Sequence, residues 1–214
     1  IEKKPFSHVL PGETALTFGM LGCHFHCGYC QNWYTSQAMR DPHSDESVNL
    51  IREITPTQMV DAARRTRASV IVSSYNEPLI TTEWAVAVFK AARAAGLLTG
   101  YVSNGHGTPT VVEYLAPWVD LFKVDLKGFD ELQYRNYGGR LAPVLDTIRE
   151  VHARGLWLEV VTLIVPGINN SDGELGELTA FLASVSPDIP WHVTAFHPDY
   201  RMTDRAGTTP EMLV

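Results

Sequence analysis

The stretch TALTFGM (residues 14–20) leads, after one residue, into GCHFHCGYCQNW (residues 22–33). The first stretch is short and rich in apolar and β-branched residues, which is typical of a buried β-strand. The second stretch holds all three cysteines of the chain, Cys23, Cys27 and Cys30. Together they predict a strand whose carboxyl end leads into a cysteine-rich loop.

Five further short apolar runs follow this first strand. They are SVIVSS (69–74), LTGYVS (98–103), VDLFKV (119–124), LWLEVVTLIV (156–165) and WHVTAF (191–196). Most of them are almost continuously apolar, which is typical of strands buried on both faces of a parallel sheet. Residues 31–54 show no clear period, so we expect a loop with a short helix there.

Capping signals predict where the intervening helices begin, because Ser and Thr cap a first turn in which Pro, Glu and Gln are favoured. These signals are Thr55 with Pro56 and Gln58, Thr82 with Glu83, Thr108 with Pro109, and Ser171 with Glu174. Strands that alternate with helices predict an α/β fold with a parallel sheet. The crossovers allow a doubly wound sheet or a barrel, and six units favour a partial (β/α)6 barrel of parallel strands.

The length and the net charge of the chain indicate which classes of protein it can belong to. The 214 residues suit a single domain over residues 1–214. The 24 acidic residues exceed the 17 basic ones, giving a net charge of -7, so the chain offers no general attraction to nucleic acid or anionic lipid. No run approaches the roughly 18 apolar residues of a membrane span, and the start lacks a signal peptide's apolar core. We therefore expect a cytoplasmic protein with no nucleic-acid or membrane partner.

The two ends of the sequence indicate that the natural protein is longer. The chain opens with Ile1, and Thr209, Pro210 and Glu211 resemble the first turn of a helix just before the sequence stops. We therefore expect an N-terminal and a C-terminal segment beyond this core.

The three cysteines predict a metal or redox centre, because an odd number crowded into one loop cannot form a disulfide framework in a domain of this size. Three cysteine thiolates leave one coordination position open on a metal centre with four such positions. In a four-iron, four-sulfur cluster, three cysteines leave one iron free for another ligand, whereas electron-transfer clusters usually have four cysteines. The alternative is a structural zinc site completed by His24, His26 or another histidine.

Polar residues follow the other predicted strands, and the carboxyl ends of parallel strands share one rim. These residues are Asn76 and Glu77, Ser103 and Asn104, Asp125 and Lys127, and His197. Structural roles remain open for each of them: a turn before a helix for Asn76 and Glu77, a turn for Asn104, a mutually neutralising pair for Asp125 and Lys127, and a satisfied histidine for His197.

The pattern Cys-x3-Cys-x-aromatic-Cys after the first strand resembles the signature of the radical S-adenosylmethionine (SAM) superfamily, with Tyr29 at the aromatic position. The resemblance implies a partial barrel of the radical SAM type that binds a 4Fe-4S cluster and SAM. It places Tyr29 near the SAM adenine and Glu77 at the methionine amino group. Glu77 matches the last position of the family's Gly-Gly-Glu motif, although Tyr75 and Asn76 replace the two glycines.

The resemblance also assigns Asp125, Lys127 and His197 to the SAM site, and we expect Asn76, Ser103 and Asn104 at the same pocket from their places at the strand ends. The positions of Asp125 and Lys127 lie at the SAM site in pyruvate formate-lyase activating enzymes, and the position of His197 carries a histidine that contacts the ribose. Five motifs resemble the radical SAM enzyme of the AmmeMemoRadiSam system, which is related to those activating enzymes. The motifs are IEKKPFSHVLPG, GCHFHCGYCQNW, KVDLKGF, TLIVPGINNS and PWHVTAFHPDYRMTD.

This resemblance implies reductive cleavage of SAM to methionine and a 5'-deoxyadenosyl radical, followed by hydrogen-atom abstraction from an unidentified substrate. A reducing donor such as flavodoxin or ferredoxin would supply the electron. Six strands cannot close an eight-stranded barrel, so we expect a lateral gap that admits a peptide, a protein or another bulky substrate. The alternative is that segments beyond the two termini complete and seal the barrel. The rival functions are a glycyl-radical enzyme activase that acts on a partner protein, and a non-catalytic iron-sulfur or zinc-binding protein.

Overall fold

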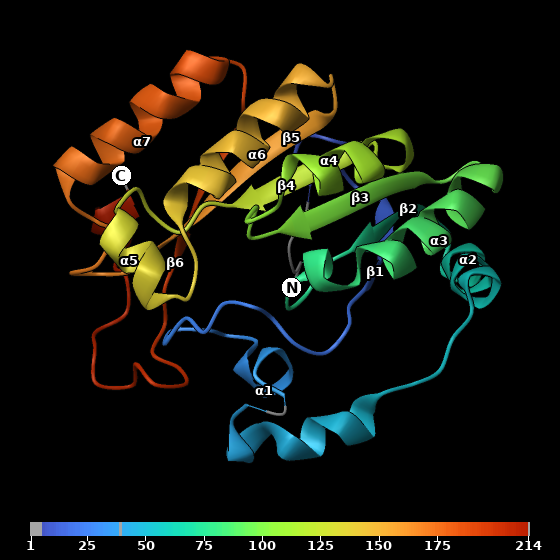
Figure 1. The fold of residues 1–214 in the computed structure, drawn as a ribbon, viewed down its shortest axis with the longest axis horizontal. Coiled ribbons are helices and arrows are strands. Elements are labelled where there is room, and N and C mark those ends of the chain that lie inside the picture. The colour runs from blue at the N-terminus through green and yellow to red at the C-terminus, as the bar shows by residue number, and fades with distance from the viewer. Residues whose placement is uncertain (1–5, 39, 214) are drawn as a thin grey trace.

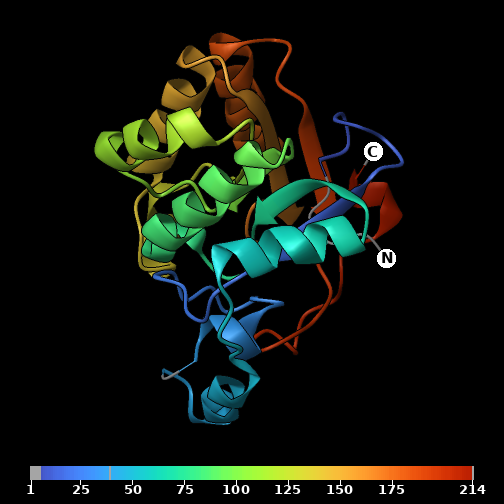
Figure 2. The same cartoon turned by 90° about the vertical axis from the view of Figure 1, so that its right-hand side faces the viewer.

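A computed structural model describes residues 6–38 and 40–213 of the chain, drawn in Figures 1 and 2. The IEKKP part of the first motif lies outside these residues. The strands are β1 (Thr14–Phe18), β2 (Ala68–Ser73), β3 (Leu98–Ser103), β4 (Leu121–Asp125), β5 (Trp157–Ile164) and β6 (Trp191–Ala195). Each overlaps a predicted run, with ends that differ by at most two residues.

Helices and short 3-10 turns separate the strands. The α-helices are α1 (Trp33–Ser36), α2 (Pro56–Arg65), α3 (Thr82–Ala94), α4 (Pro109–Leu115), α5 (Glu131–Asn136), α6 (Leu141–Ala153) and α7 (Asp172–Val185). The 3-10 segments are η1 (Pro42–Leu50), η2 (Pro78–Thr81), η3 (Ala116–Trp118) and η4 (Pro210–Leu213). The prediction of a loop with one short helix over residues 31–54 is confirmed only in part, because this segment holds two helical elements, α1 and the nine-residue η1.

The strand order decides between the two predicted architectures. The six-stranded sheet has the order β1-β2-β3-β4-β5-β6, and every neighbouring pair is parallel. A doubly wound sheet reverses its order at a switch point, whereas a barrel adds strands in sequence. The sheet curls into a half-barrel of parallel strands, so the predicted partial barrel is confirmed, with β1 and β6 as its two edges.

Both faces of the sheet are covered. The larger helices pack on one face (Figures 1 and 2), and the main core there includes Phe89 of α3, Tyr101 of β3 and Ile148 of α6. A smaller cluster contains Val72 and other strand residues, against which Phe6 and Val9 of the N-terminal segment pack. This burial on both faces explains why the strand sequences are almost continuously apolar.

Three of the four predicted helix starts are confirmed. Thr55 forms a capping box with Gln58, Thr108 accepts a hydrogen bond from the N–H of Val111, and Ser171 accepts one from the N–H of Glu174. The prediction for Thr82 as a cap is wrong, because Thr82 is already the first residue of α3. The 3-10 segment η2 directly precedes α3, and the Glu77 carboxylate caps η2 by accepting a hydrogen bond from the N–H of Leu79.

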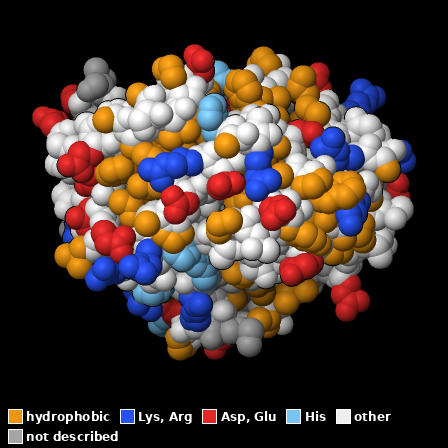
Figure 3. All heavy atoms as spheres, turned by 45° about the horizontal axis from the view of Figure 1, so that its top comes forward, with side chains coloured by type: hydrophobic (Ala, Val, Ile, Leu, Met, Phe, Trp, Pro, Cys, Tyr) orange, Lys and Arg blue, Asp and Glu red, His pale blue; other side chains and the backbone are white. Residues whose placement is uncertain are grey.

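The surface carries charge of both signs. Figure 3 shows acidic and basic side chains interspersed on the face that it draws. Within the described residues, no helix is both long and apolar enough to cross a membrane.

Candidate active site at the carboxyl ends of the strands

The three cysteines lie in the loop that follows β1, as predicted. All three thiols are free. Cys27 is buried, with 6% of its surface exposed, whereas Cys23 and Cys30 are half-buried. The loop is tightly turned, because the N–H of Cys30 donates to the carbonyl of Cys27 (3.1 Å) and the N–H of Trp33 donates to that of Cys30 (3.2 Å).

The connection between α5 and α6 holds this loop in place. The N–H of His26 donates to the carbonyl of Tyr137 across 2.9 Å. Phe25, which is 1% exposed, lies so close to Gly139 that a Cβ atom there would overlap the phenyl ring. The absence of a side chain at Gly139 therefore lets the cysteine loop dock on the protein core.

The spacing of the three thiols bears on the kind of metal centre that they could hold. Within the described part of the chain, the three cysteine sulfurs do not all lie within 4.8 Å of one another, whereas sulfurs on a tetrahedral zinc ion with 2.3 Å bonds stand about 3.8 Å apart. In a four-iron cluster each thiolate binds a different iron, so wider spacing is expected. Burial raises the pKa of Cys23 to about 12, with Glu77 adding to the rise, and that of Cys27 to about 11. Bound metal would compensate the buried thiolates.

Glu77 joins three loops of the rim. Its side chain is 1% exposed. One carboxylate oxygen accepts from the N–H of Leu79 (2.9 Å) and the hydroxyl of Ser103 (2.7 Å), and the other accepts from the N–H of Asn104 (2.8 Å). Its own N–H donates to the carbonyl of Gly22 (3.3 Å). The ends of β1, β2 and β3 are therefore held together around this carboxylate.

Asn76 fixes the position of the cysteine loop from the same side. Its side-chain oxygen accepts from the hydroxyl of Thr35 (2.8 Å) and its side-chain nitrogen donates to the carbonyl of Met20. Tyr75 and Asn76 have φ angles of 61° and 56°, in the left-handed region that favours glycine. The backbone thus keeps a glycine-like conformation where the superfamily motif has glycines, although the side chains differ.

Asp125 and Lys127 form an ion pair of 3.1 Å beside the cysteines. This contact agrees with the structural alternative, in which the two charges neutralise each other. Burial disfavours the Lys127 ammonium, but Asp125 and Cys27 outweigh that effect and hold the Lys127 pKa well above its ordinary value. A permanent positive charge therefore lies next to the cysteine loop.

The remaining two predicted residues differ in accessibility. Tyr29 is 3% exposed, and its ring packs edge-to-face on Tyr137 with centroids 5.5 Å apart, so it offers little surface to a ligand. His197 is exposed just beyond the end of β6. Its neighbour Phe196 is buried and donates its N–H to the Thr208 hydroxyl (2.9 Å). Contacts of Tyr29 and His197 with SAM stay predictions.

A protein-family model matches the stretch of sequence that contains the cysteine loop and strands β2 to β5. The model of the Radical SAM superfamily covers residues 18–182. The chain belongs to the radical SAM superfamily. Its predicted fold type is thereby confirmed.

Two curated proteins and one solved structure are similar over most of this chain. An uncharacterized protein of Methanocaldococcus jannaschii is 32% identical over 216 residues, which covers 100% of this chain and 62% of that protein. The isethionate sulfite-lyase activating enzyme of Oleidesulfovibrio alaskensis is 22% identical over 195 residues, covering 88% and 62%. The chain thus spans less than two thirds of either relative. SuiB of Streptococcus suis, bound to its precursor peptide SuiA, has a TM-score of 0.64 at 13% identity and covers 89% of this chain and 41% of SuiB.

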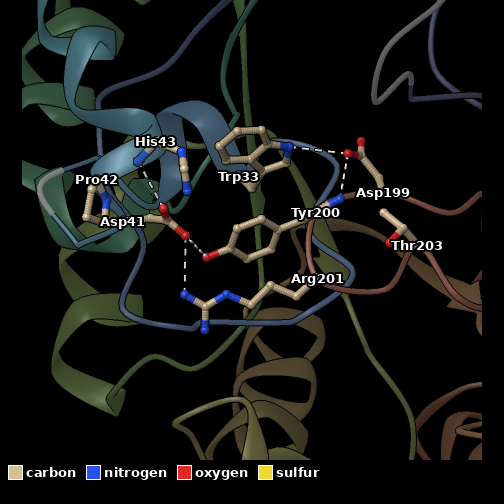
Figure 4. Close-up of a pocket in the computed structure, with 8 residues that line it drawn as sticks. All are labelled: Trp33, Asp41, Pro42, His43, Asp199, Tyr200, Arg201 and Thr203. Atoms are coloured by element: carbon tan, nitrogen blue, oxygen red, sulfur yellow. Dashed lines mark hydrogen bonds and ion pairs between the residues drawn. The ribbon is translucent and has the colours of Figure 1, made fainter.

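In this radical SAM chain the loops after β1 and β6 meet at the rim, although the two strands do not pair. Trp33 donates its indole N–H to Asp199 (3.2 Å), and Asp41 accepts from the Tyr200 hydroxyl (2.8 Å) and the Arg201 guanidinium (3.2 Å). Figure 4 shows these residues around a cavity of about 620 Å³. The expected lateral gap is therefore bridged at its carboxyl end.

Sequence reasoning missed the role of Asn169 at the rim and named His24 only as a possible zinc ligand. Asn169 is 1% exposed and donates to the carbonyls of Lys127 and Leu163, both across 2.9 Å. His24 lies 3.4 Å from the Asn104 amide, and burial lowers its pKa to about 4. Asn169 lies in the TLIVPGINNS motif, but its role depends on which segments meet in the fold, and no local pattern reveals that.

Proposed function

We propose that the chain is the catalytic core of a radical SAM enzyme in which Cys23, Cys27 and Cys30 hold a 4Fe-4S cluster. The observation that carries this proposal is the meeting of three free thiols with Glu77 and Lys127 at one rim of a parallel half-barrel. Glu77 raises the pKa of Cys23 and Lys127 lowers it, which supports a common site for the three residues. Superfamily membership supports the identity of the cluster and of SAM.

When bound and reduced, a 4Fe-4S cluster at these cysteines would supply the electron for reductive cleavage of SAM to methionine and a 5'-deoxyadenosyl radical. The chain's residues orient SAM for this step. Glu77, with Ser103 and Asn104, forms a rigid wall of the pocket. Asn76 fixes the adjoining loop. These rim contacts are proposed from position and burial together with the resemblance to the superfamily.

The other rim residues complete the proposed SAM pocket. The Asp125–Lys127 pair sets the charge beside Cys27, and exposed His197 can reach a ribose bound above β6. Tyr29 lines the adenine side chiefly through its backbone, because its ring is buried. The proposed reaction is hydrogen-atom abstraction from an unidentified substrate, for which these residues would hold SAM beside the cysteine loop.

The proposed substrate is a peptide, a protein or another bulky molecule. The unpaired edges of β1 and β6 support this class, because in the described part of the chain no strand closes the sheet between them, although the loops that follow these two strands meet at the carboxyl end. SuiB, of similar fold, has been solved with a precursor peptide bound. We further propose membership of the AmmeMemoRadiSam system on its sequence motifs, with flavodoxin or ferredoxin as electron donor in the cytoplasm.

A second candidate function is activation of a glycyl-radical enzyme. The similarity to isethionate sulfite-lyase activating enzyme favours it. In that case the hydrogen atom would come from a glycine of a partner protein. Formation of a protein-borne glycyl radical, detected by electron paramagnetic resonance, would distinguish this activity from modification of a peptide.

The central test is anaerobic. Reconstituted protein should carry about four irons and four sulfides per chain and, with dithionite and SAM, should release 5'-deoxyadenosine and methionine in equal amounts. Replacing Cys23, Cys27 or Cys30 with Ala should abolish both iron content and SAM cleavage. Stoichiometric zinc without visible charge-transfer absorption would contradict the proposal. For the substrate class, turnover that rises only with one small metabolite, which becomes modified, would exclude the bulky substrate.

A further inference from the structure

A second set of metal-ligating side chains lies away from the cysteines. His8, Glu159 and His192 each offer one ligand atom, and these three atoms all lie within 4.8 Å of one another. The residues come from three separate segments: the N-terminal segment, β5 and β6. They are the one such group of three or more His, Cys, Asp or Glu residues among the residues described.

The carboxylate at the centre of this group is buried and fixed. The Glu159 side chain has no exposed surface, whereas the His8 side chain is 51% exposed. Oε1 of Glu159 accepts from the Trp157 indole N–H (3.1 Å) and lies 3.9 Å from Nδ1 of His8. Oε2 lies 3.1 Å from Nε2 of His192 and 3.0 Å from the Lys123 ammonium. The His8 and His192 rings stand 5.3 Å apart.

We propose that His8, Glu159 and His192 bind a divalent cation of the zinc class. Two imidazole nitrogens and one carboxylate oxygen are ligands that zinc accepts, with bonds of about 2.0–2.2 Å. Ligand atoms around such an ion stand about 3.4 Å apart, so small side-chain rotations suffice to bring the three atoms onto one ion. The exposed side of His8 leaves the fourth position to a water or another small ligand.

The position of Lys123 shapes this site. The Lys123 ammonium contacts Oε2 of Glu159, so the ion would bind Oε1. Lys123 would remain a hydrogen-bond partner of Oε2, since carboxylates that ligate a metal are commonly hydrogen-bonded to a further residue. The ammonium also repels the ion, which makes the site weaker than a closed structural zinc site. Removing that charge should therefore strengthen cation binding, an effect opposite to that expected if the group were only an ion-pair network.

The bound ion would fasten the N-terminal segment to the sheet. The N–H groups of Ser7 and His8 donate to the Glu159 carboxylate, both across 3.3 Å. Phe6 lies over the Lys123 ammonium at 5.2 Å and meets the backbone at Gly100. A cation at His8 adds a metal–ligand bond to this contact, at a site distinct from the cysteine loop after β1.

X-ray absorption at the zinc edge tests the proposal on cluster-loaded protein equilibrated with Zn²⁺ and freed of excess. We expect one zinc per chain with nitrogen and oxygen ligands at about 2.0–2.1 Å and no sulfur at about 2.3 Å, and unchanged iron content. Calorimetry should show at least tenfold weaker Zn²⁺ binding for His8→Ala and His192→Ala, and unchanged binding for His152→Ala, a control at an exposed helical histidine.

Two variants, Lys123→Met and His8→Ala, test the cation site further. Lys123→Met should bind Zn²⁺ more tightly than the natural chain and should gain thermal stability when Zn²⁺ is added. His8→Ala removes a half-exposed side chain, so it keeps the fold. Zinc bound only through sulfur, no zinc retained, or equal affinity in His8→Ala and the natural chain would overturn the proposal.

Discussion

The backbone N–H of Arg201 donates a hydrogen bond of 3.0 Å to the carbonyl oxygen of Gly28. Gly28 lies between Cys27 and Cys30, and Arg201 lies beyond β6. This bond therefore connects the loop that carries the cysteines with the loop after the last strand, at the two edges of the half-barrel. Asp41 strengthens the same connection, because its carboxylate accepts from both Tyr200 and Arg201.

The first prediction is that Asp41→Ala makes the cluster labile. Without the carboxylate, Tyr200 and Arg201 lose their shared partner, and the loop that holds Gly28 loosens. Iron release to a chelator should be several-fold faster than in the natural chain. The measurement is the loss of visible absorption over time under anaerobic conditions. Asp45→Ala changes an exposed acidic residue of the same segment and should have no effect. Equal release rates for the two variants would count against the bridge.

The second prediction concerns the packing of the cysteine loop on Gly139. In Gly139→Ala the new methyl group meets the Phe25 ring, so the loop must shift and reconstitution should yield clearly less iron per chain. Gly173→Ala is the matched control, because no atom lies within 4 Å of a Cβ atom at that position. Iron and sulfide analysis of both variants provides the measurement. Normal iron content in Gly139→Ala would show that the loop adjusts freely.

The third prediction is that Glu77→Gln weakens SAM binding while iron content is largely kept. The amide loses the negative charge that now accepts from Leu79, Ser103 and Asn104, which should lower the free energy of unfolding by about 2 kcal/mol. SAM affinity, measured by equilibrium dialysis, should fall at least about tenfold, or roughly 1.4 kcal/mol. Glu83→Gln, at an exposed position of α3, is the control. Loss of iron together with SAM binding would instead indicate a purely structural role.

The fourth prediction is a pH dependence of thiol reactivity in cluster-free protein. Burial raises the pKa of Cys23 from 9.0 to about 12 and that of Cys27 to about 11, and only the thiolate is nucleophilic. Alkylation of both residues by iodoacetamide, followed by mass spectrometry, should still accelerate above pH 9.0. In urea, the alkylation rate of the unfolded protein should stop rising with pH near the ordinary thiol pKa. A plateau at that pH in folded protein would contradict the burial of these thiols.

Local sequence patterns were sufficient for the elements and for the cysteine loop. Hydrophobic runs predicted all six strands, because a strand buried on both faces needs apolar residues at consecutive positions. The capping rules found Thr55, Thr108 and Ser171, because a cap depends on residues only two or three positions apart. The same rules failed at Thr82, since the carboxylate of Glu77 caps an earlier turn.

The sequence by itself determined that strands alternate with helices and that three free thiols follow the first strand. The tertiary structure alone decided the sequential strand order, the hydrogen bonds of Glu77 to two neighbouring loops, the bridge from Gly28 to Arg201, and the meeting of His8 with Glu159 and His192. The physical reason is the range of the interactions: periodicity and capping act within a few residues, whereas these contacts join segments that approach only when the sheet curls and both of its faces are packed.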